Sequence, residues 1–134
     1  MRYIYTAVLS RNTDDPTDPT IYARIPDLDG CITTGKDLSD AIDQITDAAS
    51  VWLCSAEDHG DPVVPSTDQD AISIPSGAFK TLIKVDTNAY RALTDTRSVR
   101  KNVSLPAWMA IQAGRKGINL SQVLQEALLE RLDA

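Results

Sequence analysis

The stretch RKNVSLP, residues 100–106, decides how the last part of this sequence folds. Polar and apolar residues alternate along it until a proline ends it, a pattern typical of a β-strand. In such a strand Arg100, Asn102 and Ser104 share one face, and Val103 and Leu105 share the other. The stretch therefore predicts a strand that presents a basic, polar face.

The residues after this strand predict two helices. Pro106 suits the first turn of a helix, where a missing N–H costs little, and this helix is expected to end near Gly114 or Lys116. Gly117 supplies a turn, and Asn119 is expected to cap a second helix. The apolar residues of this second helix form one stripe: Leu120, Val123, Leu124, Ala127, Leu128 and Leu132.

Residues 98–134 are too few to bury a core of their own, because chains below about 40 residues rarely do so. The strand also lacks a partner within this segment, and an unpaired strand edge is a template for another chain. A second copy would solve both problems, with two antiparallel strands forming a ribbon over interlocked helices. We predict a homodimer with these interface residues: Val103, Leu105, Trp108, Val123, Leu124, Ala127 and Leu128.

The outer face of that ribbon is a candidate DNA-binding surface. A two-stranded ribbon fits the major groove of B-DNA, where arginine and asparagine make bidentate contacts to guanine and adenine. The start of the last helix, at Asn119, offers free N–H groups to a phosphate. The alternative is a solvated edge strand whose charges only prevent aggregation, and the spacing alone does not decide between the two. The candidate DNA-binding residues are Arg100, Lys101, Asn102, Ser104, Asn119 and Ser121.

Charge divides the sequence into two parts. The formal net charge is −6, but residues 1–95 carry −9 and residues 96–134 carry +3. Residues 96–125 contain no acidic residue at all. Such a sign change predicts two modules with different partners, of which the basic one suits nucleic acid.

The first part of the sequence predicts a small antiparallel sheet and one main helix. Strands are expected at residues 3–10, 21–26, 31–33 and 79–86, and a helix is expected to follow an N-cap at Asp37. We therefore predict an α+β protein with a first domain at 1–86, a linker at 87–97 and a second domain at 98–134.

No catalytic, metal or cofactor site is predicted. The close spacing of zinc ligands is absent from Cys31, Cys54 and His59. We interpret the two cysteines as buried thiols and His59 as a turn residue. Asp27 and Asp29 flank a turn and read as structural. No apolar run reaches the roughly 20 residues of a membrane span, and reduced cysteines suit a cytoplasmic protein.

Two segments resemble known families. VRKNVSLPAWMAIQAGRKGINLSQVLQEALLERL, residues 99–132, resembles a ribbon-helix-helix DNA-binding domain. ARIPDLDGCITTGKDLSDAIDQITDAASVWL, residues 23–53, followed by PVVPS, resembles the N-terminal domain of HicB antitoxins. The two segments occur in the order of the ribbon-helix-helix class of HicB.

The resemblance implies a function. HicB antitoxins carry a partial RNase H-like domain that binds and blocks a small, basic, mRNA-cleaving toxin, HicA, and a C-terminal domain that represses the shared operon at a palindromic operator. The DNA-facing strand residues of the family correspond to Arg100, Asn102 and Ser104, and its phosphate anchor lies near Asn119. Lys101 departs from the apolar residue usual at its position and would lean out to a phosphate, and Ser104 is shorter than the usual Arg or Lys. Assembly beyond a dimer, to a tetramer or larger, is compatible with this pattern.

The acidic residues of the first part suit a basic toxin, because such charges steer a basic partner. They equally suit a face that only maintains solubility. The candidate toxin-binding residues are Asp40, Asp43, Asp47, Glu57 and Asp58.

Two other functions remain open. One is a stand-alone regulator whose first domain senses a ligand, and the other is an enzyme derived from the RNase H-like fold. Nuclease chemistry needs several carboxylates around metal ions, and the strand RYIYTAVLS, residues 2–10, carries none. We therefore expect no hydrolytic activity.

Overall fold

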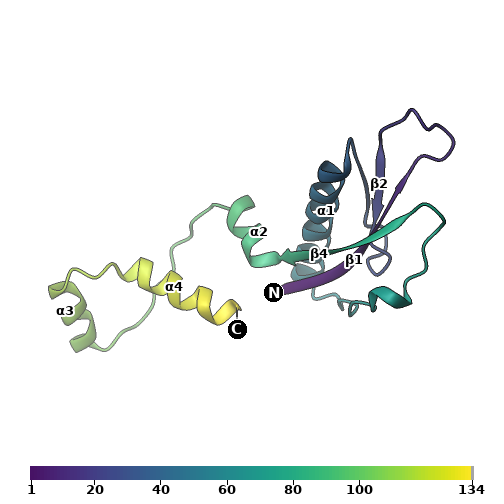
Figure 1. The fold of residues 1–134 in the computed structure, drawn as a ribbon. Coiled ribbons are helices and arrows are strands. Elements are labelled where there is room, and N and C mark those ends of the chain that lie inside the picture. The colour runs from purple at the N-terminus through teal and green to yellow at the C-terminus, as the bar shows by residue number, and fades with distance from the viewer. Residues whose placement is uncertain (134) are drawn as a thin grey trace.

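The computed structural model describes residues 1–133 and is an α+β fold, as expected. A four-stranded antiparallel sheet carries one long helix, and shorter helices follow it (Figure 1). The elements in chain order are β1 (Arg2–Arg11), β2 (Ile21–Arg24), β3 (Ile32–Gly35), α1 (Leu38–His59), the 3-10 helix η1 (Gln69–Ala71), β4 (Phe79–Asp86), α2 (Thr87–Thr94), α3 (Ala107–Arg115) and α4 (Leu120–Asp133). Within residues 1–133, no helix combines the length and the apolar character that crossing a membrane requires.

The strand order is β3-β2-β1-β4, so β1 lies inside the sheet. β4 pairs with β1 from Arg2 to Leu9, whereas β2 pairs only with the end of β1, from Val8 to Arg11. In the part of the chain that the structure describes, the first half of β1 therefore has a neighbouring strand on one side only.

The core lies between one face of the sheet and α1. Alternate residues of β1 point to this face, and α1 meets them with apolar residues at helical spacing. The buried apolar residues that form the core are Tyr5, Ala7, Leu9, Ile21, Ala23, Ile25, Leu28, Cys31, Ala41, Ile45, Ala49, Leu53, Ile83 and Val85. The helix thus covers one face of the sheet and does not cover the opposite face.

Both ends of α1 are fixed by local signals. The carboxylate of Asp37 accepts a hydrogen bond from the N–H of Asp40 at 2.8 Å, which is the expected N-cap. Gly60 ends the helix with a left-handed φ of 68°, which glycine adopts without steric cost. The helix therefore begins and ends at residues that suit these positions.

Gly35 is where β3 lies closest to α1. A Cβ atom at this position would lie 2.5 Å from the Cα of Ala41 and 2.9 Å from its Cβ. Gly35→Ala is therefore expected to lower the free energy of unfolding by about 3 kcal/mol, because backbone must move to relieve the overlap. Urea denaturation would measure this loss. Gly77→Ala, where nothing lies within 4 Å and only the positive φ of 84° is strained, should cost about 1 kcal/mol, and equal losses in the two variants would contradict the close approach.

Two segments differ from the expectation. Most of the expected linker, residues 87–97, is the helix α2, which the Asp86 carboxylate caps by accepting a hydrogen bond from Ala89 N–H at 3.1 Å. The segment without regular structure is instead 95–106. It includes the expected strand 100–105, which has no strand to pair with among the described residues 1–133.

Candidate functional site

The C-terminal part of the chain contains an apolar groove. It has a volume of about 420 Å³ and lies between residues 101–105, α3 and α4. Its lining residues are Lys101, Val103, Leu105, Met109, Ala113, Ile118, Leu120, Ser121, Val123, Leu124 and Ala127. Ala113 is the one buried residue within 96–133, so this part of the chain has no core of its own.

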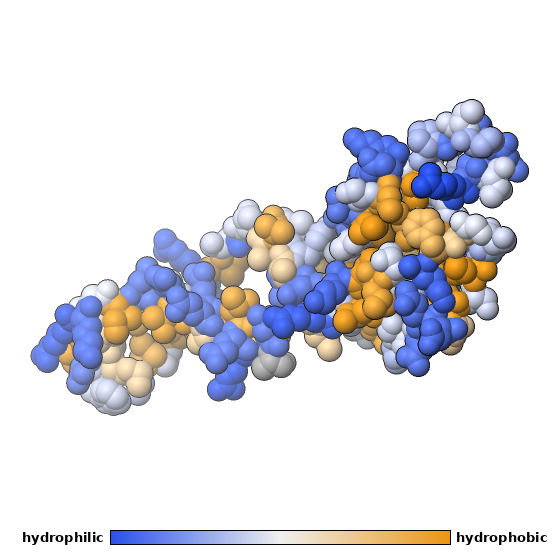
Figure 2. Space-filling view, in the orientation of Figure 1, coloured by the Kyte–Doolittle hydropathy of each residue, from blue (hydrophilic) through white to orange (hydrophobic). Residues whose placement is uncertain are grey.

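The apolar side chains around this groove are uncovered in a single copy. Orange, hydrophobic atoms are visible among blue ones at the end of the molecule that α3 and α4 form (Figure 2). Five of the seven expected interface residues line the groove, and the other two, Trp108 and Leu128, are 63% and 51% exposed. Trp108 is therefore not packed within its own chain, and burial of this side chain requires another molecule.

The segment before α3 places its side chains alternately. Lys101, Val103 and Leu105 line the groove, whereas Arg100, Asn102 and Ser104 do not. All six are exposed in one copy. The placement agrees with the predicted two faces, and it puts Lys101 on the apolar side instead of beside Arg100 and Asn102.

The start of α4 is capped as expected. The side-chain oxygen of Asn119 accepts a hydrogen bond from the N–H of Gln122 at 3.2 Å. Ser121 lies in the first turn and lines the groove. An N-terminal helix end of this kind favours an anion through its free N–H groups.

The five acidic residues singled out in α1 fall into two groups. Asp43 and Asp47 are exposed, and their carboxylates make no hydrogen bond or ion pair within residues 1–133. Asp40 accepts a hydrogen bond from the N–H of Lys36 at 2.9 Å, which lowers the pKa of its carboxyl. Only Asp43 and Asp47 are therefore available to a partner without loss of an internal contact.

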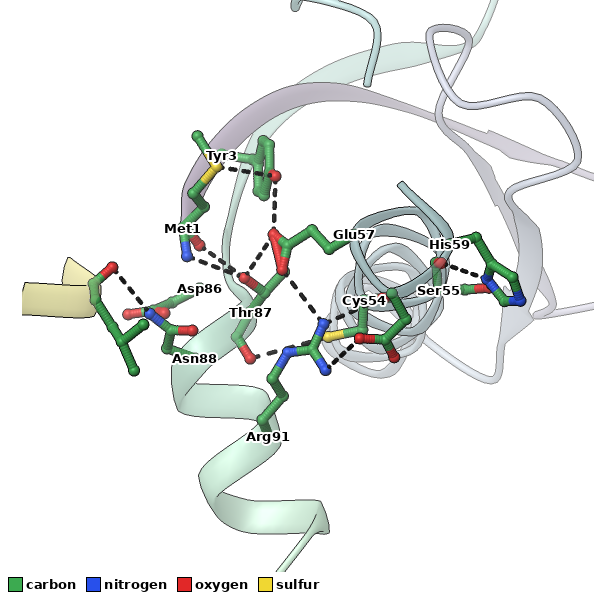
Figure 3. Close-up of polar contacts among 12 residues, drawn as sticks. Met1, Tyr3, Cys54, Ser55, Glu57, His59, Asp86, Thr87, Asn88 and Arg91 are labelled. Atoms are coloured by element: carbon green, nitrogen blue, oxygen red, sulfur yellow. Dashed lines mark hydrogen bonds and ion pairs between the residues drawn. The ribbon is translucent and has the colours of Figure 1, made fainter. Parts of the chain in front are cut away.

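The other two acids, Glu57 and Asp58, join α1 to α2, and Figure 3 shows Glu57 between the two helices and β1. Glu57 accepts hydrogen bonds from the hydroxyls of Tyr3 at 2.9 Å and Thr87 at 3.0 Å. The guanidinium of Arg91 pairs with Glu57 at 3.3 Å and with Asp58 at 2.9 Å. Sequence reasoning missed this cluster, although Asp86 in front of TNAYRALT was a usable N-cap signal for the helix that carries Thr87 and Arg91.

Tyr3 makes this cluster sensitive to alkaline pH. Burial, together with the hydrogen bond to Glu57 and the charge of that residue, raises the pKa of Tyr3 from 10 to about 12. A group whose pKa is raised on folding stabilises the folded state fully when the pH is below its pKa in the unfolded chain. This stabilisation is lost as the pH rises through its pKa in the folded chain. Tyr3→Phe should therefore make the free energy of unfolding fall less steeply between pH 10 and 12. Urea denaturation across this range would measure the slope, and identical slopes in both proteins would contradict this role of Tyr3.

The remaining polar candidates have structural roles. The carboxylate of Asp27 accepts hydrogen bonds from the N–H and hydroxyl of Thr67, at 2.8 and 2.6 Å. Cys31 and Cys54 are buried free thiols, as expected. Burial raises the pKa of both thiols. Within residues 1–133, no three side chains of the His, Cys, Asp and Glu types gather as they would around a metal ion.

The family model described as the HicB-like antitoxin of bacterial toxin–antitoxin systems matches residues 13–126. The chain belongs to this family. One chain of a solved toxin–antitoxin complex from Streptococcus pneumoniae has a similar fold, with a TM-score of 0.57 and 21% identity over 98% of this chain and 99% of that one. The antitoxin HicB of Burkholderia pseudomallei is similar, with a TM-score of 0.52 and 22% identity over 96% and 98% of the two chains. The antitoxin HicB3 gives a TM-score of 0.50 and 21% identity over 96% of both chains. No curated protein sequence matches this antitoxin.

Proposed function

We propose that the chain neutralises a small, basic, HicA-type mRNA-cleaving toxin and represses the operon that encodes the pair. The observation that carries the proposal is the uncovered apolar groove of the C-terminal part in a member of the HicB-like antitoxin family. An apolar surface of this extent in a soluble domain calls for a partner, and a second copy supplies the strand that residues 100–105 lack.

The DNA-binding unit is residues 98–134, and it acts as a dimer. Two copies of the segment 100–105 pair as a ribbon, with Arg100, Asn102 and Ser104 of each copy on its outer face. The N-terminus of α4, at Asn119 and Ser121, contacts phosphates. A two-fold dimer reads a palindrome, so the operator has two related half-sites. Lys101 belongs to the inner side of the ribbon, which supports a packing role in the dimer in place of the base or phosphate contact suggested by its charge.

The toxin-binding unit is residues 1–86, extended by α2. The free carboxylates of Asp43 and Asp47 on α1 favour encounter with a basic toxin, whereas Asp40, Glu57 and Asp58 keep internal bonds. The unit acts by binding and not by catalysis. The internal bonds of Asp27 support this, because a carboxylate held by Thr67 is poorly placed to hold a catalytic metal ion.

Purification of the tagged chain from its native cells, followed by intact-mass analysis, tests the proposal. We expect a basic protein of well under about 100 residues to co-purify in a fixed ratio, since the toxins of such pairs are small single domains, and to cleave mRNA only after it is separated. Recovery of the chain alone at low salt, or of a companion without RNA-cleaving activity, would contradict the antitoxin function.

A further inference from the structure

The first half of β1 has an open edge. β4 pairs with it on one side, but on the other side β2 reaches only from Val8 to Arg11. In Figure 1, β2 lies beside the end of β1 that is remote from the N-terminus. Among the described residues, 1–133, no strand therefore lies beside residues 2–7 on the β2 side.

The alternation of hydrogen-bonded residue pairs between β1 and β4 shows which peptide groups of β1 face the open edge. The N–H of Thr87 donates to the carbonyl of Met1 at 3.0 Å, and these residues continue the β1–β4 register. Hydrogen-bonded pairs alternate in antiparallel strands, so the odd-numbered residues of β1 bond to β4. The peptide groups of Arg2, Ile4 and Thr6 point to this side, and no hydrogen bond to them occurs within residues 1–133 outside the sheet ladders. Thr6 is fully buried, so the peptide groups that another chain can reach are those of Arg2 and Ile4.

A groove of about 570 Å³ lies along this edge, with residues 60–66 as its other wall. The hydroxyl of Tyr5 donates to the carbonyl of Val64 at 2.5 Å and holds that wall in place. Pro62 and Pro65 have no N–H to donate. The chain thus passes beside its own open edge but cannot complete a ladder with it.

The other edges of the sheet carry the usual protections against strand addition, whereas the open stretch of β1 carries one charged residue, Arg2, at its start. β3 has only four residues, and β4 carries Lys80 and Lys84; short strands and edge lysines are the usual protections. From Tyr3 to Ala7, β1 has no charged residue, and Ile4 is 50% exposed. An edge with a single charge at its start and an exposed apolar side chain is suited to accept a strand from another protein.

We infer that this groove accepts an extended segment of the toxin, which adds to the sheet as a strand beside Arg2 and Ile4. The identity of the partner rests on the proposed function. The groove lining carries the carboxylates of Glu57 and Asp61 and the cations of Arg2 and the Met1 amine, and Arg2 is paired with Asp86 at 3.5 Å. Residues 1–95 as a whole carry −9, and this negative charge suits a basic segment. Main-chain bonds to alternate residues supply affinity, while the apolar side chains of the groove select the segment.

Hydrogen exchange on the purified complex with the co-purified toxin tests the inference without altering the chain. Toxin binding should slow exchange of the amides of Arg2 and Ile4 by about tenfold or more. The outward amides of Leu82 and Lys84 on the β4 edge should not change. A stable complex that leaves residues 2 and 4 unprotected would overturn this inference and leave the antitoxin function intact, whereas absence of any complex would overturn both.

A matched pair of variants gives a second test. Ile4→Pro removes an N–H that points into the groove and is not used by β4, and toxin affinity should fall by about tenfold or more. Leu82→Pro removes the equivalent outward N–H from the opposite edge of the same sheet, at a residue 57% exposed, and should leave toxin affinity unchanged. Equal affinities of the two variants would contradict the groove as the toxin site. If either variant fails to give the far-ultraviolet circular dichroism of the parent, the exchange result decides.

Discussion

Replacement of both Arg100 and Asn102 by alanine is expected to lower operator affinity by about a thousandfold or more. Each bidentate contact to a base contributes roughly 1–3 kcal/mol of discrimination, and a dimer presents four such side chains. The remaining contacts to phosphates depend on charge and not on sequence. The double variant should therefore bind operator and unrelated DNA equally weakly, which fluorescence anisotropy at one fixed salt concentration would measure.

Arg97→Ala is the control for this variant. Its guanidinium is already paired with Asp95, at 2.8 and 3.0 Å, and lies outside the strand segment. Loss of this side chain should change DNA affinity little and should not alter the preference for operator. Toxin binding should be unchanged in all these variants, because the toxin-binding unit ends before residue 95. Full operator preference in the Arg100→Ala/Asn102→Ala protein would show that another surface reads the DNA.

Local signals in the sequence were sufficient for most of the fold. The strand Phe79–Asp86 has the predicted bounds, and α1 follows the predicted cap at Asp37. In both cases the decisive residues lie within a few positions of the element they define. Period, capping and proline rules act over that range, which is why they succeed there.

The polar cluster at Glu57 could not be predicted in the same way. Its partners Tyr3, Thr87 and Arg91 are 54, 30 and 34 residues away in sequence. Only the paired strands β1 and β4 and the helix α1 bring them together. As a result, Glu57 and Asp58 resembled free surface acids in the sequence, whereas the folded chain uses both to hold α2.

The tail shows a third situation, in which the sequence predicts an arrangement that one copy of the chain does not complete. The alternation of residues 100–105 correctly places Val103 and Leu105 on the groove side. Trp108, expected to be packed, is exposed because the helices α3 and α4 alone cannot enclose it. The local pattern therefore predicts which side chains are apolar and share one face. The dimer that would bury them remains a prediction.

Leu124→Asp is the variant expected to have the largest effect on assembly. Leu124 lines the apolar groove and belongs to the proposed interface. Two-fold symmetry places the substitution twice in each dimer, and a carboxylate without a partner is costly to remove from water. The dissociation constant of the dimer should rise by about a thousandfold or more. Light scattering after gel filtration should then give the mass of one chain, 14.6 kDa.

Gln125→Asp is the matched control, because it adds the same charge at the neighbouring residue, which does not line the groove. It should remain a dimer. Operator binding should be lost in Leu124→Asp, since a single strand cannot form the ribbon. The sheet and α1 should unfold as in the parent, because Leu124 contributes nothing to their core. If Leu124→Asp stays dimeric and keeps operator affinity, the groove does not join two copies; if the parent is a tetramer that falls to a dimer in the variant, a second contact through the N-terminal part joins the remaining pair.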